Sequence, residues 1–334
     1  VSDVNLDQRT VTCSSTGRKA SLNAPLAGLI FKLRPEIKYI VHSHINLSTA
    51  SSTGVVTSPG TLEDCRSVEQ LVLDGHQVIY QPDHGVLILM EDLKDLPTLL
   101  AQHSIYHKNP QLYDLAYHRF TRRSRLIDLF EDLVSKDGKI LDMAGGTGQV
   151  SKQLRSRGYS DITIVDRSPG MLDYAKSQLQ EIPDEHFVVS NMEDYRSTDL
   201  FDGIIVRQAI NYLSADQLGA AFRSFKDVLA PGGKLLFNTF NSDLIPPKRV
   251  PFKRDVVGDS IVLTLEGNRV EGEVITHSQR TEIYNEKTGE YSQVYDLNSF
   301  YRHPLGVYVD KLKEGGFTEI KAVIEGSSIY VIAS

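Results

Sequence analysis

The sequence is poor in cysteine and has no long apolar run, and each absence narrows the class of protein. Its 334 residues include two cysteines, Cys13 and Cys65, which lack the Cys-x-x-Cys spacing of a redox or metal motif. We expect two unpaired thiols in a reducing cytoplasm. No segment approaches the roughly 20 apolar residues that cross a bilayer, and the N-terminus lacks the basic and apolar regions of a secretory signal. We therefore expect a cytoplasmic protein with no membrane partner.

Positive charge is also scarce. There are 36 Lys and Arg residues against 43 Asp and Glu residues, so the formal net charge is −7. A nucleic acid or an anionic membrane is not attracted by such an overall field. Hydrophobic residues make up 40% and charged residues 24%, as in an ordinary globular protein, and the length suits two domains.

The two parts of the chain have different hydrophobic periodicities, and we place the boundary at 104/105. From 105 to 334, short apolar runs alternate with helical patterns, which is typical of a parallel sheet covered by helices. Residues of about 248–300 form short alternating segments instead, which predicts an antiparallel insertion. The predicted fold class is therefore α/β. Its strands are expected at 139–144, 161–166, 186–190, 202–207, 234–240, 317–324 and 328–333, with helices at about 118–135 and 306–314.

A glycine-rich loop follows the first of these strands. In Ile140-Leu-Asp-Met-Ala-Gly-Gly-Thr-Gly148 a buried strand must turn tightly into a helix, and glycines let a ligand touch the backbone there. Asp166 lies at the end of the second strand, where a carboxylate can accept both hydroxyls of a ribose. The loop has neither the G-x-G-x-x-G form nor a Gly-Lys-Ser/Thr sequence. This combination predicts a nucleoside ligand without phosphates.

Four ordered motifs resemble those of class I S-adenosylmethionine (SAM) dependent methyltransferases. They are Asp142-Met-Ala-Gly-Gly-Thr-Gly148, Val165-Asp-Arg-Ser-Pro-Gly-Met171, Phe201-Asp-Gly-Ile-Ile-Val206 and Leu229-Ala-Pro-Gly-Gly-Lys234. The resemblance covers most of 105–334. It implies a Rossmann-like, seven-stranded sheet, SAM as the cofactor and a methyltransferase activity.

The resemblance also implies which residues hold SAM. The loop backbone would cradle the methionine part, Asp166 would hold the ribose, and Met171 would pack on the adenine. Asn191 would pair with the adenine edge. For Met171 an ordinary core position, and for Asn191 a turn cap, stay open as alternatives. The full predicted cofactor site is Asp142, Ala144, Gly145, Gly146, Gly148, Asp166, Arg167, Met171, Asn191, Met192, Arg207 and Gln208.

Methyl transfer needs no fixed catalytic signature, because the sulfonium of SAM is already activated and the protein mainly positions the reactants. A general base is needed only if the nucleophile must lose a proton. The candidate catalytic residues are Tyr113, Tyr117, Tyr212 and His303, each with a structural role as the alternative. No Asn-Pro-Pro-Tyr type sequence follows 202–207, which argues against a nucleic-acid substrate and favours a small molecule.

The first hundred residues contain a second pattern. His42 and His44 share one face of a predicted strand, and His84 begins another, so three imidazoles could bind a catalytic zinc ion. These stretches, at about 3–100, resemble the class II aldolase/adducin family, which implies a truncated α/β domain. The family's catalytic acid corresponds to Asn23 here, and an asparagine cannot shuttle a proton. Two interpretations stay open: a degenerate domain for support or homo-oligomer assembly, and a retained zinc site.

Four functions are therefore open. The first is a SAM-dependent methyltransferase with a small-molecule acceptor. The second is an enzyme that consumes SAM without methylation, either by cyclising it to azetidine-2-carboxylate or by a lyase reaction, with release of methylthioadenosine. The third is a metal-dependent aldolase or lyase that uses the N-terminal histidines. The fourth is a SAM-binding module without catalysis.

Overall fold

The computed structural model describes residues 3–5, 10–12, 23–43, 50–82, 84–96, 99, 109–117, 125–241 and 248–334. The chain divides into two compact units. The N-terminal unit comprises Val1–Ile105 with Gln293–Tyr295, and the C-terminal unit comprises Tyr106–Ser292 with Asp296–Ser334. No helix in the described part of the chain has the length and apolar character needed to span a membrane.

The N-terminal unit is a small α/β structure. Its four-stranded sheet has the order β3-β6-β5-β4. β6 is buried along its length and pairs antiparallel with β3 and β5. The bounds are β1 Asp3–Asn5, β2 Thr10–Thr12, α1 Ala24–Leu33, β3 Tyr39–Ser43, β4 Ser51–Ser52, α2 Leu62–Leu73, β5 Val78–Gln81, β6 Gly85–Met90 and η1 Leu93–Asp95. Apolar residues of α1 and α2, including Leu29 and Val68, pack with Leu87 and Leu89 in one core.

The C-terminal unit contains a seven-stranded sheet of order β16-β17-β11-β10-β7-β8-β9. β9, β8, β7, β10 and β11 are parallel, and β17 is antiparallel to both of its neighbours. The bounds are β7 Ile140–Met143, β8 Ile162–Asp166, β9 Phe187–Val189, β10 Phe201–Arg207, β11 Leu229–Phe240, β16 Ile320–Glu325 and β17 Ser328–Ala333. All seven predicted strands are therefore present, and the Rossmann-like fold is confirmed.

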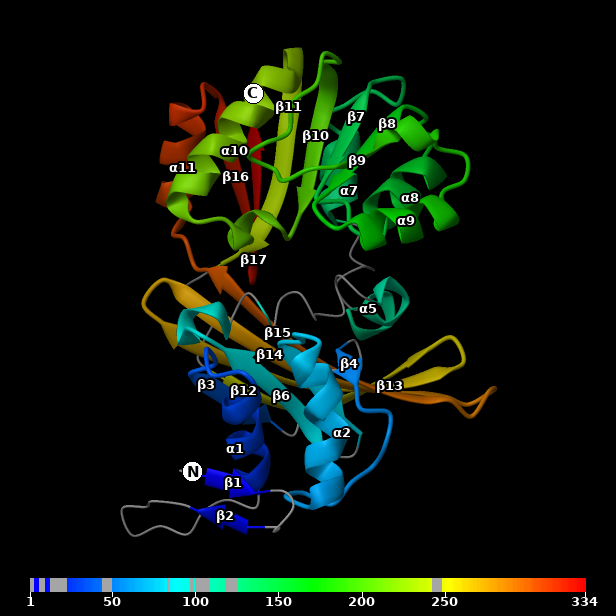
Figure 1. The fold of residues 1–334 in the computed structure, drawn as a ribbon. Helices are drawn as coiled ribbons and strands as arrows, with labels where there is room; N and C mark the ends of the chain where they lie inside the picture. Colours follow the sequence, from blue (N-terminus) through cyan, green and yellow to red (C-terminus); the bar gives the residue numbers. More distant parts are fainter. Residues whose placement is uncertain are drawn as a thin grey trace. The chain divides into compact units, whose positions relative to one another are not determined.

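Helices cover both faces of this sheet (Figure 1). Those that pack on it are α7 Arg125–Glu131, α8 Gln149–Ser156, α9 Pro169–Gln178, α10 Ala215–Val228 and α11 Leu305–Glu314. The unit also contains α5 Pro110–Ala116 and the short helices η2 Asp184–His186 and η3 Ile210–Tyr212. α9 begins at the N-cap Ser168, and α10 begins with a capping box of Ser214 and Gln217. Both helix starts follow the rule that a hydroxyl accepts the otherwise unpaired N–H groups of the first turn.

Alternation along the strands produces two cores, one on each face. Leu141, Ile204 and Phe237 pack with α10 and α11 on one face. Ile140, Ile205 and Leu236 pack with α7, α8 and α9 on the other. The central strands are therefore buried on both sides, which explains why their sequences are mostly apolar.

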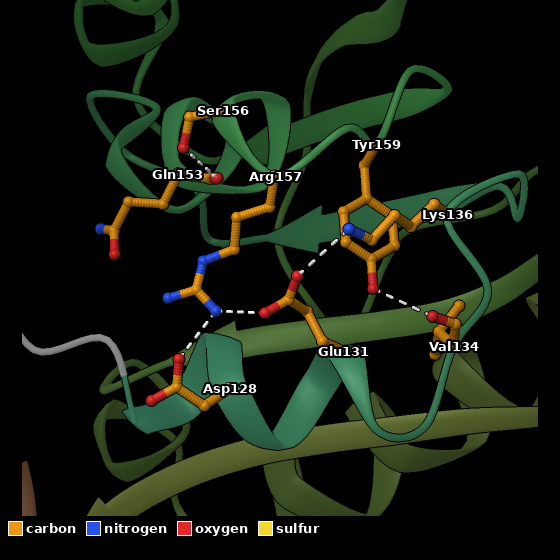
Figure 2. Close-up of polar contacts among 8 residues, drawn as sticks. All are labelled: Asp128, Glu131, Val134, Lys136, Gln153, Ser156, Arg157 and Tyr159. Atoms are coloured by element: carbon orange, nitrogen blue, oxygen red, sulfur yellow. Dashed lines mark hydrogen bonds and ion pairs between the residues drawn. The ribbon is translucent and has the colours of Figure 1, made fainter.

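An ion-pair cluster links α7 to the end of α8 (Figure 2). The guanidinium of Arg157 contacts Asp128 Oδ1 at 2.7 Å and also the carboxylate of Glu131. Lys136 Nζ lies 3.7 Å from the other oxygen of Glu131, and the hydroxyl of Tyr159 donates to the carbonyl of Val134 at 2.9 Å. Opposite charges are interleaved here, so the cluster favours the packing of the two helices that precede and follow β7.

The stretch after β11 forms a four-stranded antiparallel sheet of order β12-β13-β14-β15. Its strands are β12 Lys248–Val257, β13 Ser260–Glu271, β14 Val274–Asn285 and β15 Tyr291–Tyr301. The predicted antiparallel insertion is thus observed. Its sheet contacts α5, since Gln279 Nε2 donates to the carbonyl of Ala116 at 3.1 Å.

Candidate functional site

The candidate site lies where the order of the parallel strands reverses. After β7 the chain adds β8 and β9 on one side, and then returns to add β10 on the other side. In open α/β sheets ligands bind outside the carboxyl ends of the strands at such a reversal. Ala144 directly follows β7 and Gln208 directly follows β10. They are the two non-glycine residues with positive φ in the described part of the chain, at 59° and 50°. Backbone strain of this kind concentrates at functional sites.

In the glycine loop after β7, Gly145 packs closely against β8, whereas Gly146 borders open space. A Cβ at Gly145 would lie 2.6 Å from Ile164 Cγ2, so glycine is needed there for the loop to pack on β8. Gly146 has a φ of +56°, and a Cβ there would meet no atom within 4 Å among the described residues. The loop therefore packs tightly on the sheet at one residue and exposes backbone to open space at the next.

Asp166, at the end of β8, braces this loop. Its side chain is 1% exposed. Oδ2 accepts the N–H of Gly146 at 2.9 Å, and Oδ1 accepts the N–H of Ser168 at 2.8 Å. A carboxylate has about four acceptor positions. Holding two backbone N–H groups is thus compatible with accepting the hydroxyls of a ribose.

Two buried groups of opposite charge lie beneath the loop. Asp142 Oδ2 accepts the hydroxyl of Ser151 at 2.6 Å and its N–H at 3.1 Å. Burial raises the pKa of Asp142 to about 6, against the opposing effects of the Ser151 hydrogen bonds and the Arg207 guanidinium. Burial also lowers the pKa of Arg207, while the carboxylate of Asp142 raises it. Asp142 Oδ1 and Arg207 Nη1 are buried without a hydrogen-bond partner among the described residues.

Helix α5 is tied to the loop by Asp114. Asp114 Oδ1 accepts a hydrogen bond from the hydroxyl of Thr147 at 2.6 Å, and Asp114 Oδ2 accepts one from the side-chain amide of Gln149 at 2.7 Å. Burial raises the pKa of Asp114, and these two hydrogen bonds oppose that rise. The helix therefore holds the end of the glycine loop and the start of α8 together.

The predicted tyrosines gather on the same side as α5. The rings of Tyr113 and Tyr117 are 4.7 Å apart between centroids. Tyr117 donates to Asp296 Oδ2 at 2.5 Å, and Tyr212, which is 41% exposed, lies edge-on to Phe300. Burial raises the pKa of Tyr113 and of Tyr117 above the usual 10. Both hydroxyls therefore stay protonated and can donate hydrogen bonds, but they are poor general bases.

The remaining predicted cofactor residues differ in how exposed they are to solvent. Met171 is fully buried on α9, Met192 is half-buried, and Arg167 is exposed. Asn191 is exposed, and its amide donates to Asp194 Oδ2 at 2.9 Å. That contact joins two side chains and decides neither the adenine role nor the turn cap. The adenine role of these residues stays a prediction.

His303 is surrounded by protein groups. It is 3% exposed, and its Nε2 lies 2.8 Å from the carbonyl oxygen of Leu213. Its ring stacks on Tyr301 and lies edge-on to Tyr308. These contacts give His303 a packing role between the segment after β15 and the loop after η3. We do not include it in the proposed reaction.

Of the three predicted zinc ligands, the structure describes two. The rings of His42 and His84 lie 4.7 Å apart between centroids, and Asn23 Nδ2 lies 2.9 Å from His42 Nδ1. His44 is outside the described residues, as is Cys13, while Cys65 is a buried free thiol. Within the described ranges, no group of three His, Cys, Asp or Glu side chains is placed to hold a metal ion. The zinc site stays a prediction.

Three polar residues near the loop are not among those predicted from the sequence: Asp114, Asn238 and Asp296. Asp114 lies between the two predicted tyrosines of α5, which was a usable signal. Asn238 is a polar residue within the apolar strand β11, and such a position often has a specific hydrogen bond. Asp296 lies in the antiparallel insertion, and only the tertiary fold brings it to Tyr117.

The fold of the C-terminal unit is Rossmann-like, and comparisons with known proteins agree. Residues 140–233 match the family model of the methyltransferase domain. A putative methyltransferase of Bacillus subtilis, YqeM, is 32% identical over 118 residues, which is 34% of this chain and 46% of the relative. The chain spans about half the length of the curated relatives it matches.

Solved structures with the same fold include two methyltransferases. A SAM-dependent methyltransferase from Clostridium acetobutylicum has a TM-score of 0.56 at 18% identity, covering 69% of this chain and 99% of that protein. The sugar N-methyltransferase KedS8 from Streptoalloteichus also has a TM-score of 0.56 at 18% identity, covering 66% and 92%. The chain thus has the class I methyltransferase fold. The match to the family model lies outside the first hundred residues, so the aldolase-like domain stays a prediction.

Proposed function

We propose that this protein is a SAM-dependent methyltransferase that acts on a small-molecule acceptor. The observation that carries the proposal is the position of Asp166 and of the glycine loop at the reversal of strand order. The family match at 140–233 and the fold shared with KedS8, whose name describes a sugar N-methyltransferase, support it.

The residues at the end of β7 and β10 fit the methionine part of SAM. That part carries an ammonium and a carboxylate group. Asp142 Oδ1 and Arg207 Nη1 are buried polar atoms of complementary charge without described partners, and the space beyond Gly146 is open. Asp142 would hold the ammonium group and Arg207 the carboxylate, because buried charges are stable only when they are compensated.

When bound, SAM supplies a methyl group on a sulfonium, which is an activated electrophile. The chain's own residues then position the reactants and exclude water. The protonated hydroxyl of Tyr113 would donate a hydrogen bond on the acceptor side, and the rings of Tyr113 and Tyr117 would favour a cation nearby. Asp296 is the carboxylate that Tyr117 contacts there.

Incubation with SAM tests the proposal and separates it from a reaction of SAM alone. We expect S-adenosylhomocysteine (SAH) to form only when an acceptor is added, for example from a panel of aminosugars and nucleotide sugars, as measured by mass spectrometry. Methylthioadenosine formed without an acceptor would instead show a SAM-cyclising or lyase reaction. Failure of SAM and SAH to raise the melting temperature would contradict a SAM site altogether.

For the N-terminal unit we propose a supporting role for a reduced, aldolase-like domain. What favours it is the contact of Asn23 with His42, since an amide stands where that family has an acid. We expect elemental analysis of protein purified without chelator to give far less than one zinc per chain. One zinc per chain that is lost in a His84→Ala variant would show a retained metal site instead.

A further inference from the structure

Gln208 is held in a strained conformation by a side chain from the next strand. Its φ is +50°, a region that residues with a Cβ avoid. Its N–H donates to Asn238 Oδ1 at 3.0 Å. A strained residue persists only where its surroundings over-determine it. Here the amide oxygen of Asn238 makes a hydrogen bond that holds Gln208 in this conformation.

Asn238 is placed for this task by the parallel register of β10 and β11. Arg207, the last residue of β10, pairs with Asn238 in that register. Gln208 therefore follows the last residue pair of β10 and β11. Its N–H bonds to the side-chain oxygen of Asn238, where a residue within the strand would bond to a backbone carbonyl. Asn238 is 5% exposed, so this hydrogen bond is shielded from water. Loss of the oxygen would leave a poorly solvated N–H and favour another backbone conformation.

The conformation of Gln208 affects the candidate ligand site through the neighbouring residue Arg207. This residue is one position before the strained turn, and its buried guanidinium is electrostatically coupled to Asp142, Tyr113 and Asp114. A change in the turn would shift Arg207 relative to Asp142, the two groups that fit the methionine part of SAM. Asp166, at the end of β8, would hold the adenosine part instead, and its hydrogen bonds with Gly146 and Ser168 do not involve Gln208.

We propose that Asn238 is a positioning residue for the cofactor. Its amide oxygen holds Gln208 in the left-handed conformation, and this fixes Arg207 in the geometry that receives the methionine end of SAM. The inference rests on the proposed function, because it assigns Asn238 to the same SAM site.

The test compares SAH with adenosine, which lacks the methionine part, by titration calorimetry. We expect N238L to weaken SAH binding about tenfold or more and to leave adenosine binding within about twofold. In the Q208G background, where the left-handed conformation is unstrained, the same substitution is expected to weaken SAH binding about threefold or less. N238D keeps an acceptor oxygen and should stay within about threefold of the parent for SAH.

The control is T239V on the same strand. Thr239 is buried, and its hydroxyl lies 3.1 Å from that of Tyr308, on the face covered by α11. This variant should lower the melting temperature without changing SAH binding. If N238L does not fold, N238S gives the same comparison, because its shorter hydroxyl cannot reach Gln208.

Apart from an N238L variant that binds SAH as the wild type does, two results would overturn the inference. One is equal weakening of SAH and adenosine, and the other is an equal loss in the Gln208 and Q208G backgrounds. Failure of the proposed function looks different, because then the wild-type protein would bind no SAH. If the wild-type protein binds SAH and the N238L variant binds it equally well, the proposed function stands and the role of Asn238 is contradicted.

Discussion

Replacing Asp166 with alanine is expected to weaken SAH binding about 100-fold or more. In the proposed site the carboxylate would accept ribose hydroxyls through charge-assisted hydrogen bonds, which contribute about 1.5–3 kcal/mol each. It also holds the N–H groups of Gly146 and Ser168, so its loss releases the glycine loop as well. Titration calorimetry with SAH measures the change in Kd.

The matched control for this change is Asp173→Ala. Asp173 is an exposed carboxylate on α9, so its removal makes the same change in charge close to the site. SAH binding by this variant should equal that of the wild type. A D166A variant that is folded and binds SAH within about threefold of the wild type would remove Asp166 from the cofactor site.

The substitution Asp142→Asn is expected to stabilise the ligand-free protein at neutral pH. Burial raises the pKa of Asp142 from the ordinary 3.8 to about 6, so the ionised form is disfavoured in the folded state. Between these two values the folded protein binds more protons than the unfolded chain. The free energy of unfolding therefore falls as the pH rises from about 4 to about 6, and it stays lower above that range.

The asparagine keeps an acceptor for Ser151 and has no charge to bury. Raising the pKa of Asp142 from 3.8 to about 6 corresponds to at most about 3 kcal/mol in the free energy of unfolding. We expect D142N to be about 1–3 kcal/mol more stable than the wild type in urea unfolding at pH 7.5. The difference should vanish near pH 4, while SAH binding at pH 7.5 is weakened. Asp137→Asn, an exposed residue just before β7, is the control. An equal pH dependence for D142N and wild type would contradict the buried charge.

The strands and the cofactor loop could be predicted because their signals are local. Short apolar runs marked β7, β8 and β10, and the glycines from Gly145 to Gly148 marked the loop. Ser168 and Ser214 marked two helix starts, because a cap acts on N–H groups only two or three residues away. Element boundaries were less predictable: β16 begins at Ile320 rather than 317, and α7 ends at Glu131 rather than 135. The largest difference in a strand is in β11, which begins at Leu229 rather than 234, since Leu229 pairs with Phe201 before the register shifts.

The parts of the site that depend on distant contacts were not predictable. Asp296 reaches Tyr117 across 179 positions of sequence, and no spacing rule connects an antiparallel strand to a helix so far away. Asn238 was missed because a single polar residue in a buried strand does not indicate its partner. His303 was predicted as a catalytic candidate, and its contacts with Leu213 and Tyr301 are set by packing that the sequence alone does not encode locally.

Asp114 joins helix α5 to the glycine loop. Its carboxylate accepts hydrogen bonds from Thr147, within the loop, and from Gln149, at the start of α8. Hydrogen bonds to a charged group contribute about 1.5–3 kcal/mol each. A ligand that orders the glycine loop would therefore also order α5, and a substitution of Asp114 would weaken that link without removing any group from the loop itself.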